Sequence, residues 1–151
     1  MNLTRQEIEN MPAGPAINQL VAEKILGRIW VHTAKTNNLI DPDDWPVWQV
    51  AFNDIEVGKG DVGNPVGGAM GYSTDIARAW QVVEKMHADG WGYGLSAGRA
   101  TIDPLPGHRL PDCTFYTRDG RQGWNQAETA PIAICRAALL ALFAPTLPTA
   151  P

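Results

Sequence analysis

The sequence has few cysteines, and nothing else in it points to an oxidising compartment. Cys113 and Cys135 are its two cysteines. They could pair if the protein were exported, but Cys135 lies in an apolar stretch with helical spacing and reads as a small buried hydrophobe. We therefore expect two free thiols.

Basic clusters and long hydrophobic runs are also missing. The formal net charge is −4, and a duplex nucleic acid needs a basic face, so we expect no duplex partner. The longest apolar stretch, residues 130–145, is too short to span a bilayer and contains Arg136. No signal-peptide pattern opens the chain. We expect a cytoplasmic protein that does not enter a membrane.

Recognisable catalytic and metal motifs are absent as well. The three histidines, His32, His87 and His108, have no cysteine or carboxylate neighbours at ligand spacing, so we predict no metal site. No serine-hydrolase, zinc-protease or paired-carboxylate motif is visible. We predict no cofactor and name no catalytic residue. Enzymatic activity stays open because catalytic groups can be assembled in space from distant positions.

The apolar pattern indicates one α+β domain. Hydrophobic residues make up 44% of the chain and charged residues 19%, the composition of an ordinary globular protein. Thr4 and Glu7 fit a capping box that opens a short first helix. Apolar periodicity predicts helices near 16–26, 74–87 and 131–143, and β-forming residues predict strands within 28–33, 91–97, 99–103 and 112–118, with 48–57 as one further strand.

These elements favour a small antiparallel sheet covered by helices. We assign residues 1–144 to this single domain and 145–151 to a flexible tail. Residues 58–71 contain six glycines and are predicted to form a surface loop that is either functional or disordered.

Three stretches resemble a known family: residues 17–27 (INQLVAEKILG), 72–86 (YSTDIARAWQVVEKM) and 127–142 (AETAPIAICRAALLAL). Their order and spacing are similar to those of the phage ABA sandwich domain, found in small proteins of tailed phages and prophages. The resemblance implies a phage origin and a layered α/β sandwich, and it implies no reaction. Residues 49–71 depart from the family pattern because they are longer and richer in glycine.

A glycine-rich approach to a helix start, residues 67–80, is the first candidate for a binding site. Ser73 or Thr74 is expected to cap the helix, with Asp75 in its first turn. Free N–H groups at Tyr72, Ser73 and Thr74 would suit a phosphate or carboxylate, although Asp75 would repel an anion unless a cation neutralised it. The alternative is a capped helix that follows a loop and binds nothing.

Arg136 is the second candidate, because it is the one charge in a helix that is otherwise apolar and is expected to be capped by Thr129. A guanidinium keeps its proton, so it must reach a carboxylate, a bound anion or solvent. A structural ion pair with Asp75, a ligand anion and a side chain that extends to solvent are the three alternatives.

The six tryptophans form the third feature. Trp80 is placed on the core face of its helix. Trp45 and Trp48, flanked by Pro42 and Pro46, are expected to be half-exposed, where they would stack on a base, form an interface or simply pack.

We therefore predict a binding protein without catalytic residues. Its ligand would be small and anionic, such as a cyclic nucleotide or an ADP-ribose derivative serving as a host immune signal, which the protein would sequester in the host cytosol. The alternative is a phage protein that binds a host protein through its Pro/Trp-rich segment. A homo-oligomer with Trp45 or Trp48 in its interface is expected. The predicted ligand-binding residues are Tyr72, Ser73, Thr74, Asp75, Arg136, Trp45, Trp48 and Thr129.

Overall fold

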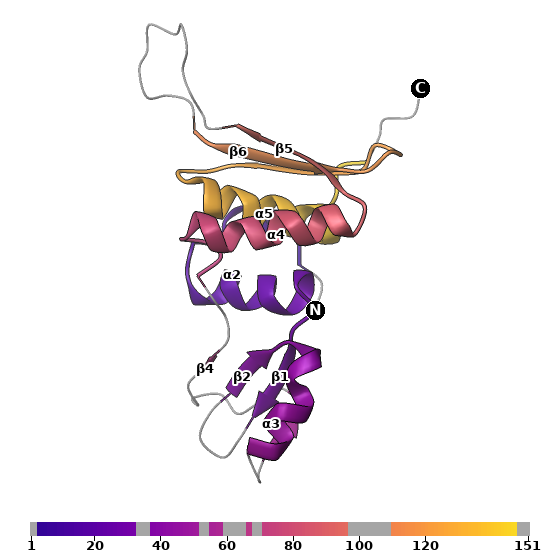
Figure 1. The fold of residues 1–151 in the computed structure, drawn as a ribbon. Helices are drawn as coiled ribbons and strands as arrows, with labels where there is room; N and C mark the ends of the chain where they lie inside the picture. Colours follow the sequence, from indigo (N-terminus) through magenta and orange to yellow (C-terminus); the bar gives the residue numbers. More distant parts are fainter. Residues whose placement is uncertain are drawn as a thin grey trace, which may run out of the picture.

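The computed structural model stacks two small sheets on opposite sides of a layer of helices (Figure 1). It describes residues 3–32, 37–51, 55–58, 66–67, 71–96 and 110–147. The elements, in chain order, are α1 (Arg5–Glu9), α2 (Pro15–Leu20), the π-helical turn η1 (Val21–Ile25), β1 (Ile29–His32), β2 (Asn37–Ile40), the 3-10 turn η2 (Pro42–Asp44), α3 (Trp45–Ala51), β3 (Glu56–Val57), β4 (Val66–Gly67), α4 (Ile76–Ala88), β5 (Gly92–Ser96), β6 (Asp112–Tyr116), β7 (Gln122–Gln126) and α5 (Ala130–Phe143). The predicted α+β fold is confirmed.

The first sheet is the antiparallel array β5-β6-β7. Gly92 pairs with Tyr116, and Tyr116 pairs with Gln122 across the hairpin. Burial alternates along β6 and β7, as expected for a sheet with one face on the core. Cys113 and Phe115 point to that core face, and both cysteines of the chain are free thiols, as predicted.

Helix α5 fills the space beneath this sheet and is the centre of the core. Its fourteen residues include ten that are buried, which confirms the central position expected of an apolar helix. Gly123 of β7 permits the closest approach: a Cβ atom placed there would lie 2.3 Å from the Ala141 nitrogen and 2.4 Å from the Ala137 oxygen. The strand can lie directly on the helix backbone because this position has no side chain.

Helix α4 lies beside α5, and its buried residues are Ala79, Val82, Val83 and Met86. The prediction that Trp80 belongs to the core is wrong, because 39% of this residue is exposed. Its ring instead meets the ring of Tyr93 edge-on, with centroids 5.9 Å apart. The buried face of α4 is centred on Val82 and Val83, so Trp80 lies beside this face and not within it.

The second sheet has the strand order β3-β1-β2-β4, with β2 and β4 parallel and the other pairs antiparallel. The prediction of one strand over residues 48–57 is wrong, because Trp45–Ala51 is helical and the strand is limited to Glu56–Val57. Asp41 caps the preceding turn by accepting a hydrogen bond from the Asp43 nitrogen at 2.9 Å. Pro42 then sits at the start of the turn, where proline favours helical geometry.

The two ends of the described chain are tied together. The predicted capping box is present at Thr4 and Glu7, and Arg5 donates a hydrogen bond to the Ala144 carbonyl at 2.7 Å. Gln122 and Thr146 exchange two backbone hydrogen bonds, of 3.0 and 2.7 Å. The single domain over 1–144 and the flexible tail over 145–151 stay predictions. The strand expected at 99–103 and most of the glycine-rich stretch 58–71 lie outside the described residues.

Candidate functional site

The start of α4 is closed by its own residues. Asp75, and not Ser73 or Thr74, is the N-cap, so that prediction is wrong: the Asp75 carboxylate accepts from the Ala77 nitrogen at 2.8 Å. The Thr74 and Asp75 nitrogens both donate to the Gly71 carbonyl, at 3.3 and 3.0 Å. A carboxylate therefore occupies the place where an anion would sit, as the helix dipole favours.

Ser73 joins α4 to the start of α2. Its nitrogen and its hydroxyl both donate to Asn18 Oδ1, at 3.0 and 2.7 Å, and its oxygen accepts from the Gly14 nitrogen at 3.0 Å. Ser73 and Asn18 are both buried. Because these hydrogen bonds lie within the protein, Ser73 has no free donor for a ligand. Its role at this place is to fix the loop before α4.

Four of the predicted residues line one cavity, which we call the Arg136 cavity. Its volume is about 370 Å³, and it lies between the segment before α2, the start of α4 and the start of α5. The described residues that line it are Asn10, Pro12, Ala13, Ser73, Thr74, Glu128, Thr129, Ile132 and Arg136. Ser73, Thr74, Thr129 and Arg136 are thus brought together from positions up to 63 residues apart (136 − 73).

Arg136 is the cation of this cavity and makes one hydrogen bond within the protein. Its Nε donates to the Met11 carbonyl at 2.9 Å. No carboxylate of the described residues forms an ion pair with it, so the predicted pairing with Asp75 does not occur. Its half-buried guanidinium therefore keeps two terminal nitrogens that no described protein group engages.

The N-terminus of α5 opens on the same cavity. Thr129 is the N-cap, as predicted, but its side chain makes no capping hydrogen bond. Pro131 occupies the first turn and has no N–H to offer. Thr129 lines the cavity about two helical turns before Arg136.

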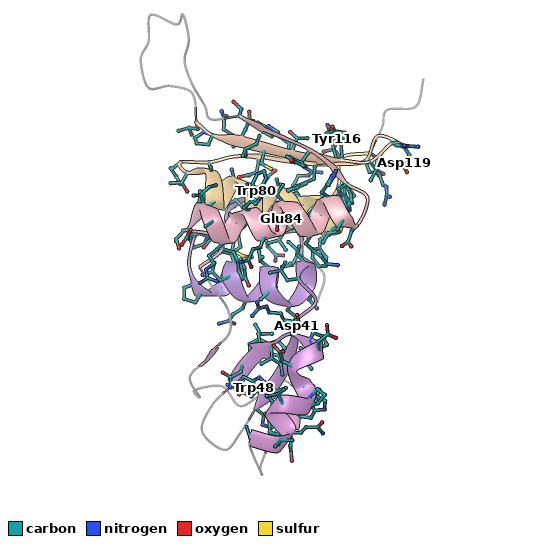
Figure 2. The ribbon with its side chains drawn as sticks, in the orientation of Figure 1. Asp41, Trp48, Trp80, Glu84, Tyr116 and Asp119 are labelled. Carbon is teal, nitrogen blue, oxygen red and sulfur yellow. The ribbon has the colours of Figure 1, made fainter. Side chains whose placement is uncertain are left out.

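The remaining predicted residues lie elsewhere. Tyr72 is fully buried, its hydroxyl has no partner among the described residues, and burial raises its pKa. Trp45 and Trp48 belong to α3, at the far end of the molecule from the three-stranded sheet (Figure 2). Trp48 lines a separate cavity of about 330 Å³ together with residues of β2. None of these rings reaches the Arg136 cavity.

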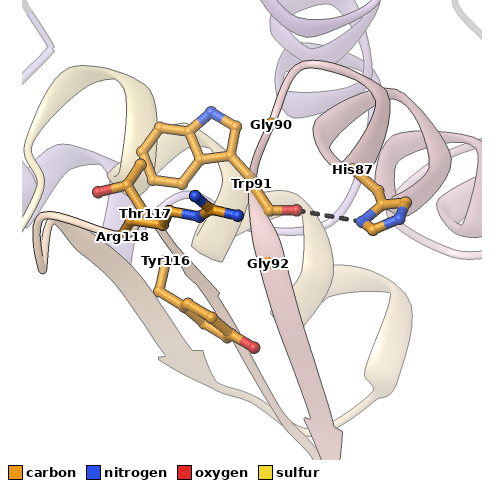
Figure 3. Close-up of a pocket in the computed structure, with 7 residues that line it drawn as sticks. All are labelled: His87, Gly90, Trp91, Gly92, Tyr116, Thr117 and Arg118. Atoms are coloured by element: carbon orange, nitrogen blue, oxygen red, sulfur yellow. Dashed lines mark hydrogen bonds between the residues drawn. The ribbon is translucent and has the colours of Figure 1, made fainter.

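A larger cavity, about 580 Å³, lies at one end of the three-stranded sheet and was not foreseen (Figure 3). We call it the Trp91 cavity; it is lined by His87, Gly90, Trp91, Gly92, Tyr116, Thr117 and Arg118. His87 Nδ1 donates to the Trp91 carbonyl at 3.3 Å, and the Arg121 guanidinium lies 5.7 Å from the Trp91 ring centre. The strand register, which joins Gly92 to Tyr116, forms this site.

Within the described ranges, no helix is long and apolar enough to cross a membrane. No group of three or more His, Cys, Asp or Glu in the same ranges is placed to hold a metal ion.

The chain matches a protein-family model and is similar to a solved structure. No curated protein matches the sequence significantly. Among solved structures, the chain is similar to the 2.0 Å crystal structure of a phage protein from Bacillus cereus ATCC 14579, with 24% identity, a TM-score of 0.48, and coverage of 94% of this chain and 90% of that one. The model of the phage ABA sandwich domain matches residues 19–139. The chain therefore belongs to the phage ABA sandwich domain family.

Proposed function

We propose that this phage-family protein binds a small anionic ligand in the Arg136 cavity. The observation that carries the proposal is the Arg136 guanidinium, which is half-buried, permanently charged and engaged at Nε alone. A charge that is partly removed from water is stabilised by a counter-charge. A ligand phosphate or carboxylate would supply it through a bidentate contact with the terminal nitrogens.

The cavity walls suit a small anion. Thr129 contributes a hydroxyl group that makes no capping hydrogen bond, and a hydroxyl group can donate to an anionic oxygen. The Thr74 hydroxyl also lines the cavity, but it donates to the Gly71 carbonyl at 3.4 Å. The volume, about 370 Å³, is within the range of ordinary ligand pockets. Glu128 also lines the cavity, but it is exposed, so water screens its repulsion of an anion.

We extend the proposal to sequestration of a nucleotide immune signal in the host cytosol. The signal would be held by a phosphate on Arg136 and would not be altered. Since Tyr72 is buried and no tryptophan lines the cavity, the base would extend past the cavity mouth. Affinity would then come chiefly from the phosphate.

Calorimetry tests both claims, that the cavity binds an anion and that its ligand is a nucleotide. The four probes are inorganic phosphate, sulfate, ADP-ribose and a cyclic dinucleotide. Arg136→Met keeps the apolar stem and removes the charge. We expect it to weaken binding by about 10- to 100-fold, the effect of losing a hydrogen bond to a charged group. Arg78→Met is the control, because it removes the same charge from α4 outside the cavity.

The outcomes distinguish binding of a simple anion from binding of a nucleotide. Binding of a nucleotide that Arg136→Met weakens by about tenfold or more supports sequestration. Equal affinity for inorganic phosphate and for the nucleotides would limit the site to a simple anion. If no probe binds wild type, or if Arg136→Met binds as tightly as Arg78→Met, the cavity is not an anion site.

A second candidate function, binding of a host protein, is favoured by the surface of α3. This helix has no buried residue, and Val47 and Val50 are 68% and 88% exposed. These two side chains lie three positions apart, on one face of the helix, and together offer an apolar surface to a partner. Replacing both valines by serine should abolish capture of that host protein. The alternative occupant is a second copy of the chain, and light scattering that gives a mass near 16.4 kDa would exclude it.

A further inference from the structure

The outer face of the three-stranded sheet carries two exposed aromatic rings on adjacent strands. Side chains alternate between the faces, and Cys113, Phe115 and Gly123 mark the face that rests on the helices. Tyr116 and Trp124 therefore point outward, and they are 45% and 50% exposed. Figure 2 shows Tyr116 on the side of the sheet away from α4 and α5.

The register places these rings next to each other. Tyr116 pairs with Gln122, and Trp124 pairs with Thr114, two residues further along both strands. The two rings are thus diagonal neighbours, and such positions lie about 7–8 Å apart in an antiparallel sheet. No ring contact joins the two in the part of the chain that the structure describes.

Strand β5 has no side chains on the outer face next to these rings. Its two outward positions next to them are Gly92 and Gly94, which pair with Tyr116 and Thr114. A Cβ atom at Gly92 would lie 2.4 Å from the Tyr116 ring, so this ring covers Gly92. A Cβ atom at Gly94 would meet nothing within 4 Å, so the space above it is open. Tyr116 also lines the Trp91 cavity. We call the strip of the outer face from this cavity past Tyr116 and Gly94 to Trp124 the trough.

The polar groups around the trough are mostly neutral. The other outward residues of β6 and β7 are Asp112, Thr114, Gln122 and Gln126. Amide and hydroxyl groups can both donate and accept hydrogen bonds. The outward positions of the three strands include no lysine or arginine. At the end of the trough, Arg118 lines the Trp91 cavity without an ion pair to any described residue.

We propose that this face, from the Trp91 cavity across Tyr116 to Trp124, binds the pyranose rings of a glycan. The C–H groups on a sugar face carry partial positive charge and pack on the negative face of an aromatic ring. Sugar hydroxyls both donate and accept, which matches the amides and hydroxyl beside the two rings. A single-stranded nucleic acid would need cations along its backbone, and the strands offer none there. The proposal uses no residue of the Arg136 cavity.

The test is calorimetric titration of the full chain with maltohexaose, cellohexaose and chitohexaose, and with a short oligothymidylate. We expect one of the sugars to bind with a Kd of about 1 mM or below. Tyr116→Ala and Trp124→Ala should each weaken this binding by about three- to tenfold. Gly92→Ala should weaken it as well, because its methyl group displaces the Tyr116 ring. Tyr116→Phe, which keeps the ring, should retain most of the affinity.

Trp80→Ala is the matched control, since it removes an exposed tryptophan from α4 and should leave sugar binding unchanged. Thermal unfolding of each variant establishes that it is folded. Failure of all three sugars to bind, or equal binding by Tyr116→Ala, Trp124→Ala and Trp80→Ala, overturns the proposal. Preferential binding of oligothymidylate overturns it in favour of a nucleic-acid face, and a dimer that Trp124→Ala dissociates overturns it in favour of self-association.

Discussion

Replacing Gly123 by alanine should strongly destabilise the protein. The added Cβ would lie 2.3, 2.4 and 2.7 Å from three backbone atoms of α5, where ordinary contacts begin at about 3.5 Å. The obstacle is helix backbone, which cannot turn aside as a side chain can. Relief requires β7 and α5 to separate by about 1 Å, a gap that forfeits roughly half of the dispersion energy across that contact.

Overpacking of a core typically costs about 1–3 kcal/mol, and the three backbone clashes place this substitution at or above the upper limit. A loss of about 3 kcal/mol corresponds to a fall in Tm of about 6–12 °C for a domain of this size. Differential scanning calorimetry measures it. Gly94→Ala in the same sheet is the control, because its Cβ would meet nothing within 4 Å. A Tm for Gly123→Ala within about 1 °C of wild type would refute the packing argument.

Three other changes test separate parts of the structure. Arg136→Met should lower the free energy of unfolding by about 1.5–3 kcal/mol by chemical denaturation, since it removes one hydrogen bond from a charged group to the Met11 carbonyl; an unchanged free energy would show that this hydrogen bond contributes nothing. Cys113 and Cys135 should resist a thiol reagent at pH 8 until the chain is unfolded, because burial raises the pKa of each thiol from 9.0 to about 12. For the same reason the free energy of unfolding should fall as the pH rises above about 9, where the thiols ionise in the unfolded chain but not in the folded one; a flat profile from pH 9 to 11 would contradict this. Asp75→Ala should cost about 0.5–2 kcal/mol through the lost cap, and an unchanged Tm would show that the cap contributes nothing.

The helices that pack on the core could be predicted because their apolar residues recur at helical spacing. The prediction was wrong for α3. Trp45–Ala51 has no buried residue, so its sequence shows no apolar residues at helical spacing that would indicate a helix packed on the core. What makes α3 helical is the capped turn at Asp41 together with Pro42, signals that favour a turn as much as a helix.

The candidate sites divide in a similar way. Arg136 could be recognised because a charge in an apolar helix is conspicuous, and Thr74 and Thr129 because they precede helices. These residues line one cavity because of the way α4 and α5 pack. This packing cannot be predicted from the local sequence pattern. The Trp91 cavity and the outer sheet face could not be predicted, because both depend on the strand register. A register shift by one residue would turn Tyr116 and Trp124 inward.

The central position of α5 has a consequence for synthesis of the chain. Helices α1, α2 and α4 bury their apolar faces in a core that α5 completes, yet all three leave the ribosome before it. At about 5–20 residues per second, the 55 residues (143 − 88) from the end of α4 to the end of α5 take several seconds to make. During this interval the earlier helices hold exposed apolar surface, and the nascent chain is a natural client for a chaperone until residue 143 emerges.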